Sequence, residues 1–140
     1  MLKDHLKKFY FDGNYNCAES VLRAGNEYYA LNLHERDMIL IGAYGAGIQC
    51  GNTCGAVLAG AAILSMKYIE SKCHESPDIH DITCRLMQKF EEKYGSTLCR
   101  DIKPQSFCPE RRCLATVEAA CDILEEVIDG FEKEKCRETI

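Results

Sequence analysis

The run of small and aliphatic residues from Gly55 to Leu64 constrains the fold more than any other stretch of this 140-residue chain. Glycine and alanine are mixed there with valine, leucine and isoleucine, a composition typical of a buried helix whose neighbours pack close to its backbone. We predict a helix over about 53–71, which would be roughly 27 Å long, the diameter of a small domain. A buried helix of that length is expected to be the central helix of the fold.

Helical periodicity recurs on both sides of this run. From Leu114 to Phe131 the apolar residues keep a strict 3,4 spacing, and four other segments carry shorter apolar stripes of the same period. Alternating strand patterns and hairpin turn signals are missing. The sequence therefore predicts an all-α fold, a single compact domain over 1–140 with about five to six helices around the central one. The charged end, 132–140, is predicted to fray.

Local signals indicate where some of these helices begin. Asn16 and Glu19 have the spacing of a capping box, so a helix is predicted to start at Cys17. Pro109 is typical of a first helical position and is expected to open the last helix. The connection over 96–108 is predicted to be irregular, because it contains Pro104 and is followed by Pro109.

Charge and hydropathy exclude several classes of partner. The formal net charge of -5 argues against a nucleic acid or an anionic membrane surface, because both attract basic proteins. The most apolar run, 56–66, is too short to span a bilayer, so no membrane insertion is expected. The first residues, MLKDHLKKFYFDG, have charges within their apolar stripe and lack the apolar core of a signal peptide. We therefore expect a cytoplasmic protein.

The chain contains ten cysteines, which we sort by their predicted positions. A cytoplasmic chain with so many thiols is expected to be redox-active, to bind metal, or to use some of them as small buried residues. The partial positive charge at a helix N-terminus lowers the pKa of a thiol, and Cys17, Cys54 and Cys113 are predicted to lie at such positions. Cys84 and Cys121 fall on apolar helix faces and are predicted to pack in the core.

A glycine-rich loop precedes the central helix. Four glycines within 42–51 allow positive φ angles and a close approach of another segment to the backbone. Cys50 and Cys54 form a C-x3-C spacing, and we name Cys50, Gly51 and Gly55 as supporting residues of a site at Cys54. No lysine or arginine lies near this loop, so phosphate binding is not expected.

These residues together carry a resemblance to a known family. The sequence resembles the C_GCAxxG_C_C family of putative redox-active proteins over almost its whole length, through Cys17, the motif Cys54-Gly55-Ala56-Val57-Leu58-Ala59-Gly60, Cys99 and Cys113. The resemblance implies a redox role for a single domain of this size. The chain departs from the family pattern at Ala59, where the pattern has glycine.

Our leading hypothesis from the sequence is a thiol–disulfide redox protein, with a possible activity as an oxidoreductase. Cys54 is the expected nucleophile, Cys17 its nearest partner, and Cys99 with Cys113 a second or resolving pair. No cofactor is expected in this case. The expected partner is a redox protein or a small thiol.

Two other hypotheses remain open at this point. The same four cysteines, Cys17, Cys54, Cys99 and Cys113, could hold a zinc ion or an iron–sulfur cluster in a metal-binding module. Alternatively, the chain is a helical interaction protein with incidental cysteines, in which case the four would lie apart in space. The small residues of the central helix also leave a homodimer open.

Overall fold

The computed structural model describes residues 1–138, and these residues are mainly helical. No strand occurs among them, so the predicted all-α class is confirmed. Short 3-10 or π-helical segments are η1 (Leu2–His5), η2 (Lys8–Asp12), η3 (Ile39–Tyr44), η4 (Gly47–Gly51) and η5 (Cys73–Glu75). The six α-helices are α1 (Cys17–Tyr28), α2 (Glu35–Met38), α3 (Gly55–Tyr68), α4 (Ile79–Tyr94), α5 (Cys99–Ser106) and α6 (Leu114–Glu138).

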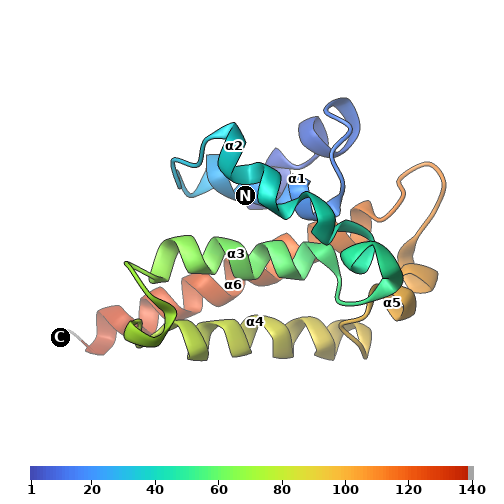
Figure 1. Cartoon of the computed structure of the whole chain (residues 1–140). Helices are drawn as coiled ribbons and strands as arrows, with labels where there is room; N and C mark the ends of the chain where they lie inside the picture. The colour runs from blue at the N-terminus through green and yellow to red at the C-terminus, as the bar shows by residue number, and fades with distance from the viewer. Residues whose placement is uncertain (139–140) are drawn as a thin grey trace.

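The small-residue helix α3 is the centre of the fold, as the sequence predicted. It packs against α1 on one side and against α4 and α6 on the other (Figure 1). Gly25 of α1 leaves room for Ile63, since a Cβ there would be 2.3 Å from the Cδ1 of Ile63. Gly60 of α3 leaves room for Leu86 in the same way, at 3.2 Å. Small residues on both sides of α3 therefore allow three helices to pack closely around it.

The core lies between these helices. Ile63 and Leu64 of α3, Leu86 and Phe90 of α4 and Leu124 of α6 are fully buried. The predicted stripe of α6 is confirmed, because each of its members is buried: Leu114, Val117, Cys121, Leu124, Ile128 and Phe131. None of the described helices combines the length and the apolar composition that a membrane span requires.

The connection before α6 differs from the prediction. Part of the segment predicted to be irregular forms α5, and Cys99 is its first residue. The last helix begins at Leu114 and not at Pro109. Before it the chain makes a tight turn, in which Cys108 and Arg112 exchange backbone hydrogen bonds and Arg112 has a φ of 52°. This turn competes with a helical start, because a left-handed residue cannot continue a right-handed helix.

The charged end of the chain also differs from the prediction of a frayed segment over 132–140. Helix α6 continues through Glu138, and its last turns contact the rest of the fold. Glu134 accepts two hydrogen bonds from Arg85 of α4, at 2.9 Å each. Lys135 pairs with Asp78 at 2.9 Å. These cross-helix contacts hold the end of α6, whereas residues 139–140 lie outside the described residues.

Candidate functional site

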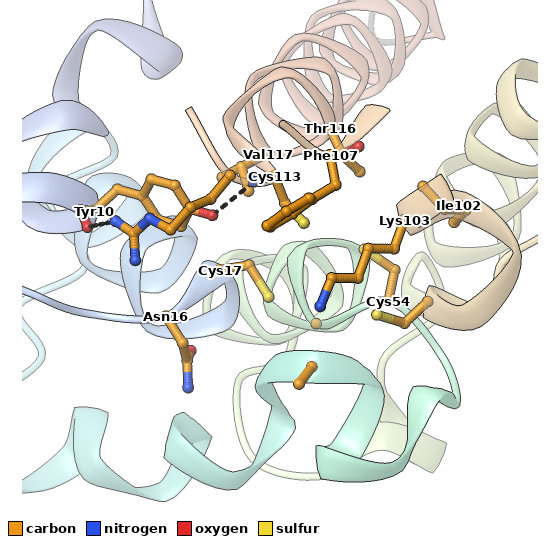
Figure 2. A pocket seen from close by; sticks show the side chains of 14 residues that line it. Tyr10, Asn16, Cys17, Cys54, Ile102, Lys103, Phe107, Cys113, Thr116 and Val117 are labelled. Carbon is orange, nitrogen blue, oxygen red and sulfur yellow. Dashed lines mark hydrogen bonds between the residues drawn. The ribbon is translucent and has the colours of Figure 1, made fainter. Parts of the chain in front are cut away.

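Four helices begin at one cavity. Cys17 and Cys99 are the first residues of α1 and α5, Cys54 is the N-cap of α3, and Cys113 immediately precedes α6. All four line a cavity of about 190 Å³. Figure 2 shows the side chains of Cys17, Cys54 and Cys113 around this space, each from a different element. The structure thus brings together the four cysteines that the sequence singled out. The hypothesis of an interaction protein with incidental cysteines predicted that these four would lie apart, and this prediction is wrong.

The start of α1 is set by the predicted capping box, which the structure confirms. The Asn16 side chain accepts a hydrogen bond from the Glu19 N–H at 3.0 Å, and the Glu19 carboxylate accepts one from the Asn16 N–H at 3.1 Å. The Asn16 amide also donates to the Gly42 carbonyl at 2.9 Å. Asn16 therefore fixes Cys17 in the first turn of α1 and ties that turn to the glycine-rich loop.

A short backbone pairing positions Cys54 and Cys99. Thr53 and Leu98 form an isolated antiparallel β-bridge. Beside it, the N–H groups of Cys54 and Cys99 donate to carbonyls of the opposite segment, at 2.8 and 2.6 Å. Side chains alternate between the two faces of an extended pair, so Cys54 and Cys99 lie on the face opposite Thr53 and Leu98. The bridge therefore places the Cys54 and Cys99 side chains on the same face of this extended pair.

Glycines let these helix starts come close together. A Cβ added at Gly55 would be 2.9 Å from the sulfur of Cys17, and one added at Gly47 would be 2.7 Å from the Cβ of Cys99. Gly47 has a φ of 62°, in the left-handed region. A Cβ at Gly45 would be 2.4 Å from the Asn16 side chain. The glycine-rich loop is therefore a close packing surface for the segments that carry Cys17 and Cys99.

Tyr10 and Arg112 position Cys113. The Tyr10 hydroxyl accepts a hydrogen bond from the Cys113 N–H at 3.1 Å. The Arg112 guanidinium donates to the Tyr10 carbonyl at 2.6 Å and lies 4.3 Å from the centre of the Tyr10 ring. Tyr10 itself is buried. The N-terminal segment thus holds the start of α6 at the cavity, although it lies about a hundred residues away in sequence.

The charged residues of the cavity are cationic. Lys103 and Arg112 line it, and no aspartate or glutamate does. The remaining walls include Ile102, Phe107 and Val117. The cavity of this acidic chain therefore combines apolar walls, thiols and positive charge.

Burial raises the pKa of two of the cavity thiols, those of Cys54 and Cys17. It is the largest cause of the rise in the pKa of Cys54 to about 12, and the nearby Cys17 sulfur adds to that rise. Backbone N–H groups of Val57 and Ala56 act in the opposite direction. Burial likewise raises the pKa of Cys17. The sequence predicted an activated thiol at Cys54 from the helix N-terminus, whereas in the structure the loss of solvation opposes the helix's contribution and raises the pKa of this thiol.

Cys113 has a different balance of effects. Burial again raises its pKa, and the neighbouring Cys17 and Cys99 thiols act in the same direction. Lys103 and Arg112 lower it, because positive charge favours the thiolate. Of the four cavity cysteines, Cys54 is buried and the other three are partly exposed. An external molecule therefore reaches Cys99 or Cys113 before Cys54, whereas burial raises the pKa of Cys17 as it does that of Cys54.

Of the supporting residues named from the sequence, Gly55 lines the cavity, whereas Cys50 and Gly51 do not. Cys50 is exposed, contacts the Gly47 carbonyl at 3.6 Å and does not line the cavity, so the C-x3-C spacing does not bring Cys50 and Cys54 together there. Gly51 has a φ of 75°, and a Cβ on it would be 3.3 Å from that of Arg100, so it shapes the loop against α5.

Of the two cysteines predicted to lie in the core, only Cys121 does so. Cys121 is fully buried in α6, as predicted. Cys84 is only half-buried, and its sulfur lies 3.8 Å from the Nε2 atom of His80 on the outer side of α4. The prediction for Cys84 was wrong because its position is at the edge of the apolar stripe.

Some lining residues were not identified from the sequence. Tyr10, Lys103 and Phe107 carry no motif, and they lie in segments far apart along the chain. The available signal was the group of four cations between Cys99 and Cys113, of which Lys103 and Arg112 line the cavity. Their place at the cavity depends on how α5 and the turn before α6 fold.

The donor set was also compared with the needs of a metal ion. Within residues 1–138, no three side chains of histidine, cysteine, aspartate or glutamate lie close enough together to hold one. The four cavity thiols share a cavity without converging on one point in this arrangement. Zinc or an iron–sulfur cluster would therefore require the thiols to adopt a different arrangement.

Comparison with known proteins gives one match. A family model described as "Putative redox-active protein (C_GCAxxG_C_C)" matches residues 15–127, a range that contains all four cavity cysteines. No curated protein and no solved structure shows significant similarity to the chain.

Proposed function

The chain belongs to the C_GCAxxG_C_C family of redox-active proteins, and we propose that it carries out thiol–disulfide exchange with Cys17, Cys54, Cys99 and Cys113. The observation that supports this proposal is the arrangement of the four helix starts, which bring these thiols to one cavity. Four thiols can form two disulfides and so store four electrons.

The environments of the thiols suggest different roles. Cys113 is partly exposed, and Lys103 and Arg112 oppose the rise in its pKa that burial causes. We assign the first attack to Cys113, and not to Cys54 as the sequence suggested. Cys54 is buried beside Cys17, so these two form the inner pair, and Cys99 is the second thiol accessible from the cavity.

The proposed exchange follows from this order. The Cys113 thiolate attacks one sulfur of a substrate disulfide, the substrate S–S bond breaks, and one substrate thiolate leaves and takes up a proton. A second cavity thiol, Cys99, then loses its proton and attacks the Cys113 sulfur, which releases the second substrate thiol. The protein has lost two electrons and two protons and gained one disulfide. The substrate disulfide has been reduced to two thiols.

The inner pair extends this chemistry. The Cys17 and Cys54 thiols can pass two further electrons to the Cys99–Cys113 disulfide by the same exchange, which leaves the disulfide on the inner pair. A small thiol or a redox protein would regenerate the reduced protein. We place this cycle in the cytoplasm, where free thiols are normally kept reduced.

The test measures, for each cysteine, the fraction that remains a free thiol as oxidant is added. Reduced protein would be titrated with a mild disulfide oxidant, alkylated, digested and analysed by mass spectrometry. We expect Cys17, Cys54, Cys99 and Cys113 to lose alkylation in pairs. We also expect Cys113→Ser to slow oxidation strongly. The matched control is Cys73→Ser, since Cys73 is exposed in η5 and does not line the cavity.

Two results would count against the proposal. Oxidation confined to exposed cysteines such as Cys50 and Cys73, with the cavity thiols still alkylated, would remove its basis. Metal analysis of anaerobically purified protein would address the metal-binding alternative. One zinc ion or cluster per chain, lost in Cys54→Ser, would establish a metal centre in place of exchange.

A further inference from the structure

We propose that the cavity selects small disulfides with negatively charged ends and that Lys103 receives the anionic group. This inference rests on the proposed exchange chemistry and names the substrate class. Three properties of the cavity support it: the sign of its charges, the state of Lys103 and the space available.

The first property is the charge of the lining. The chain has 22 acidic residues against 17 lysines and arginines, yet the lining contains two cations and no carboxylate. A disulfide with carboxylate or sulfonate ends would meet attraction there, and a cationic one repulsion. The helix starts add to this field. The start of α3 has no side-chain cap, and its Ala56 and Val57 N–H groups act on the Cys54 sulfur with the partial positive charge of a helix N-terminus.

The second property distinguishes Lys103 from Arg112. Arg112 already donates to the Tyr10 carbonyl, so its guanidinium is held in the structure. The ammonium group of Lys103 lies 5.0 Å from the centre of the Phe107 ring. Within residues 1–138, the ion pairs made by lysines involve other residues than Lys103. Lys103 is therefore the cation that can pair with an incoming anion at the cavity.

The third property is size. The cavity volume of about 190 Å³ exceeds only slightly the roughly 150 Å³ of an engineered protein cavity that holds benzene. This volume matches one short arm of a small molecule. Ile102 and Phe107 offer apolar contact to the methylene groups of such an arm. The geometry favours a short-chain organic disulfide with an acidic end over a protein disulfide.

The test uses three disulfides of similar length that differ in their ends: dithiodipropionate is anionic, bis(2-hydroxyethyl) disulfide is neutral and cystamine is cationic. The rate at which each oxidises Cys113 in the reduced full chain would be divided by its rate with free cysteine, which removes intrinsic reactivity. We expect the normalised rate to be about tenfold higher for the anionic than for the neutral compound, and lowest for the cationic one. Added salt should reduce the difference.

Substitution at Lys103 tests the assigned residue. Lys103→Gln should reduce the ratio of the anionic to the neutral rate to near one. The ratio is the deciding quantity, because loss of Lys103 also affects the Cys113 thiolate and would slow both compounds alike. Lys133→Gln, an exposed change in α6 outside the cavity lining, should keep the full ratio.

The outcomes separate this inference from the function on which it rests. Equal normalised rates for the three compounds, or a ratio unchanged in Lys103→Gln, would overturn the charge selection while exchange itself stands. Faster normalised oxidation by a disulfide-bonded protein than by any of the three would overturn the small-molecule class. Failure of every disulfide to oxidise the cavity thiols would instead overturn the proposed function.

Discussion

The sulfur of Cys17 lies against the backbone of Gly55, at a distance that leaves no room for a side chain. A Cβ on Gly55 would be 2.9 Å from that sulfur and 2.6 Å from the Tyr44 carbonyl oxygen. Cys54 immediately precedes Gly55, so this contact places the Cys17 and Cys54 thiols at the same helix start. The close approach of the Cys17 sulfur to the start of α3 therefore depends on the absence of one carbon atom.

Gly55→Ala should destabilise the protein and disturb the inner pair. The added methyl group meets a backbone oxygen, which cannot move as a side-chain tip can, so we expect a loss of about 1–3 kcal/mol in the free energy of unfolding. The matched control is Gly130→Ala in α6, where a Cβ has no atom within 4 Å. That change should stabilise by about 0.5–1 kcal/mol. Urea unfolding of reduced protein measures both, and equal effects would contradict the contact.

Alkaline pH should destabilise the fold partly through Cys54. Its folded pKa of about 12 lies above the value near 8.5 of an unfolded thiol. The stabilising contribution is therefore complete below about pH 8.5 and is lost as the pH rises toward 12. The loss for one thiol is at most about 1.4 kcal/mol per pH unit. Thermal unfolding between pH 8 and 11 under reducing conditions should decline less steeply in Cys54→Ala.

The same shift predicts slow alkylation of Cys54. Its rate should still be rising above pH 9, where a free thiol has nearly reached its plateau. The exposed Cys73 provides the internal reference in the same protein. A midpoint at or below that of Cys73 would show that the helix N-terminus, and not burial, dominates at Cys54.

The Asn16 side chain should stabilise the fold in two ways, as an acceptor for the Glu19 N–H and as a donor to the Gly42 carbonyl. Asn16→Ala removes the cap of α1 and the bond to the Gly42 carbonyl, and we expect a loss of about 1–2 kcal/mol. Asn16→Asp keeps an acceptor for the Glu19 N–H but cannot donate to Gly42, so its loss should be smaller. Chemical unfolding compares the two. An aspartate variant as unstable as the alanine variant would show that capping contributes little.

Tyr10→Phe should loosen the start of α6. The change leaves the Cys113 N–H without its partner, which costs about 1–3 kcal/mol for a group shielded from water. Alkylation of Cys113 should become faster as its segment opens. Tyr44→Phe is the control, because Tyr44 is exposed, and it should change stability by less than about 0.5 kcal/mol. Unchanged alkylation in Tyr10→Phe would contradict the role of this hydrogen bond.

Much of the fold follows from local patterns in the sequence. The strict spacing of α6 gave its buried face, and the small residues of α3 gave its central place. Helix α5 was missed because it has only eight residues and contains Pro104. Its one buried residue is Ile102, and a single apolar position does not form a recognisable helical stripe. Short helices of this kind are stabilised by their neighbours more than by their own composition.

The sequence by itself determined that the chain is helical and indicated the four cysteines that line the cavity, because periodicity and motif order are properties of the chain alone. Only the tertiary structure decided what surrounds those cysteines. The burial that raises the pKa of Cys54, the partial exposure of Cys113 and the cations at the cavity arise from segments distant in sequence. The physical reason is that a helix N-terminus is a local feature, whereas solvation and charge at a thiol depend on everything packed around it.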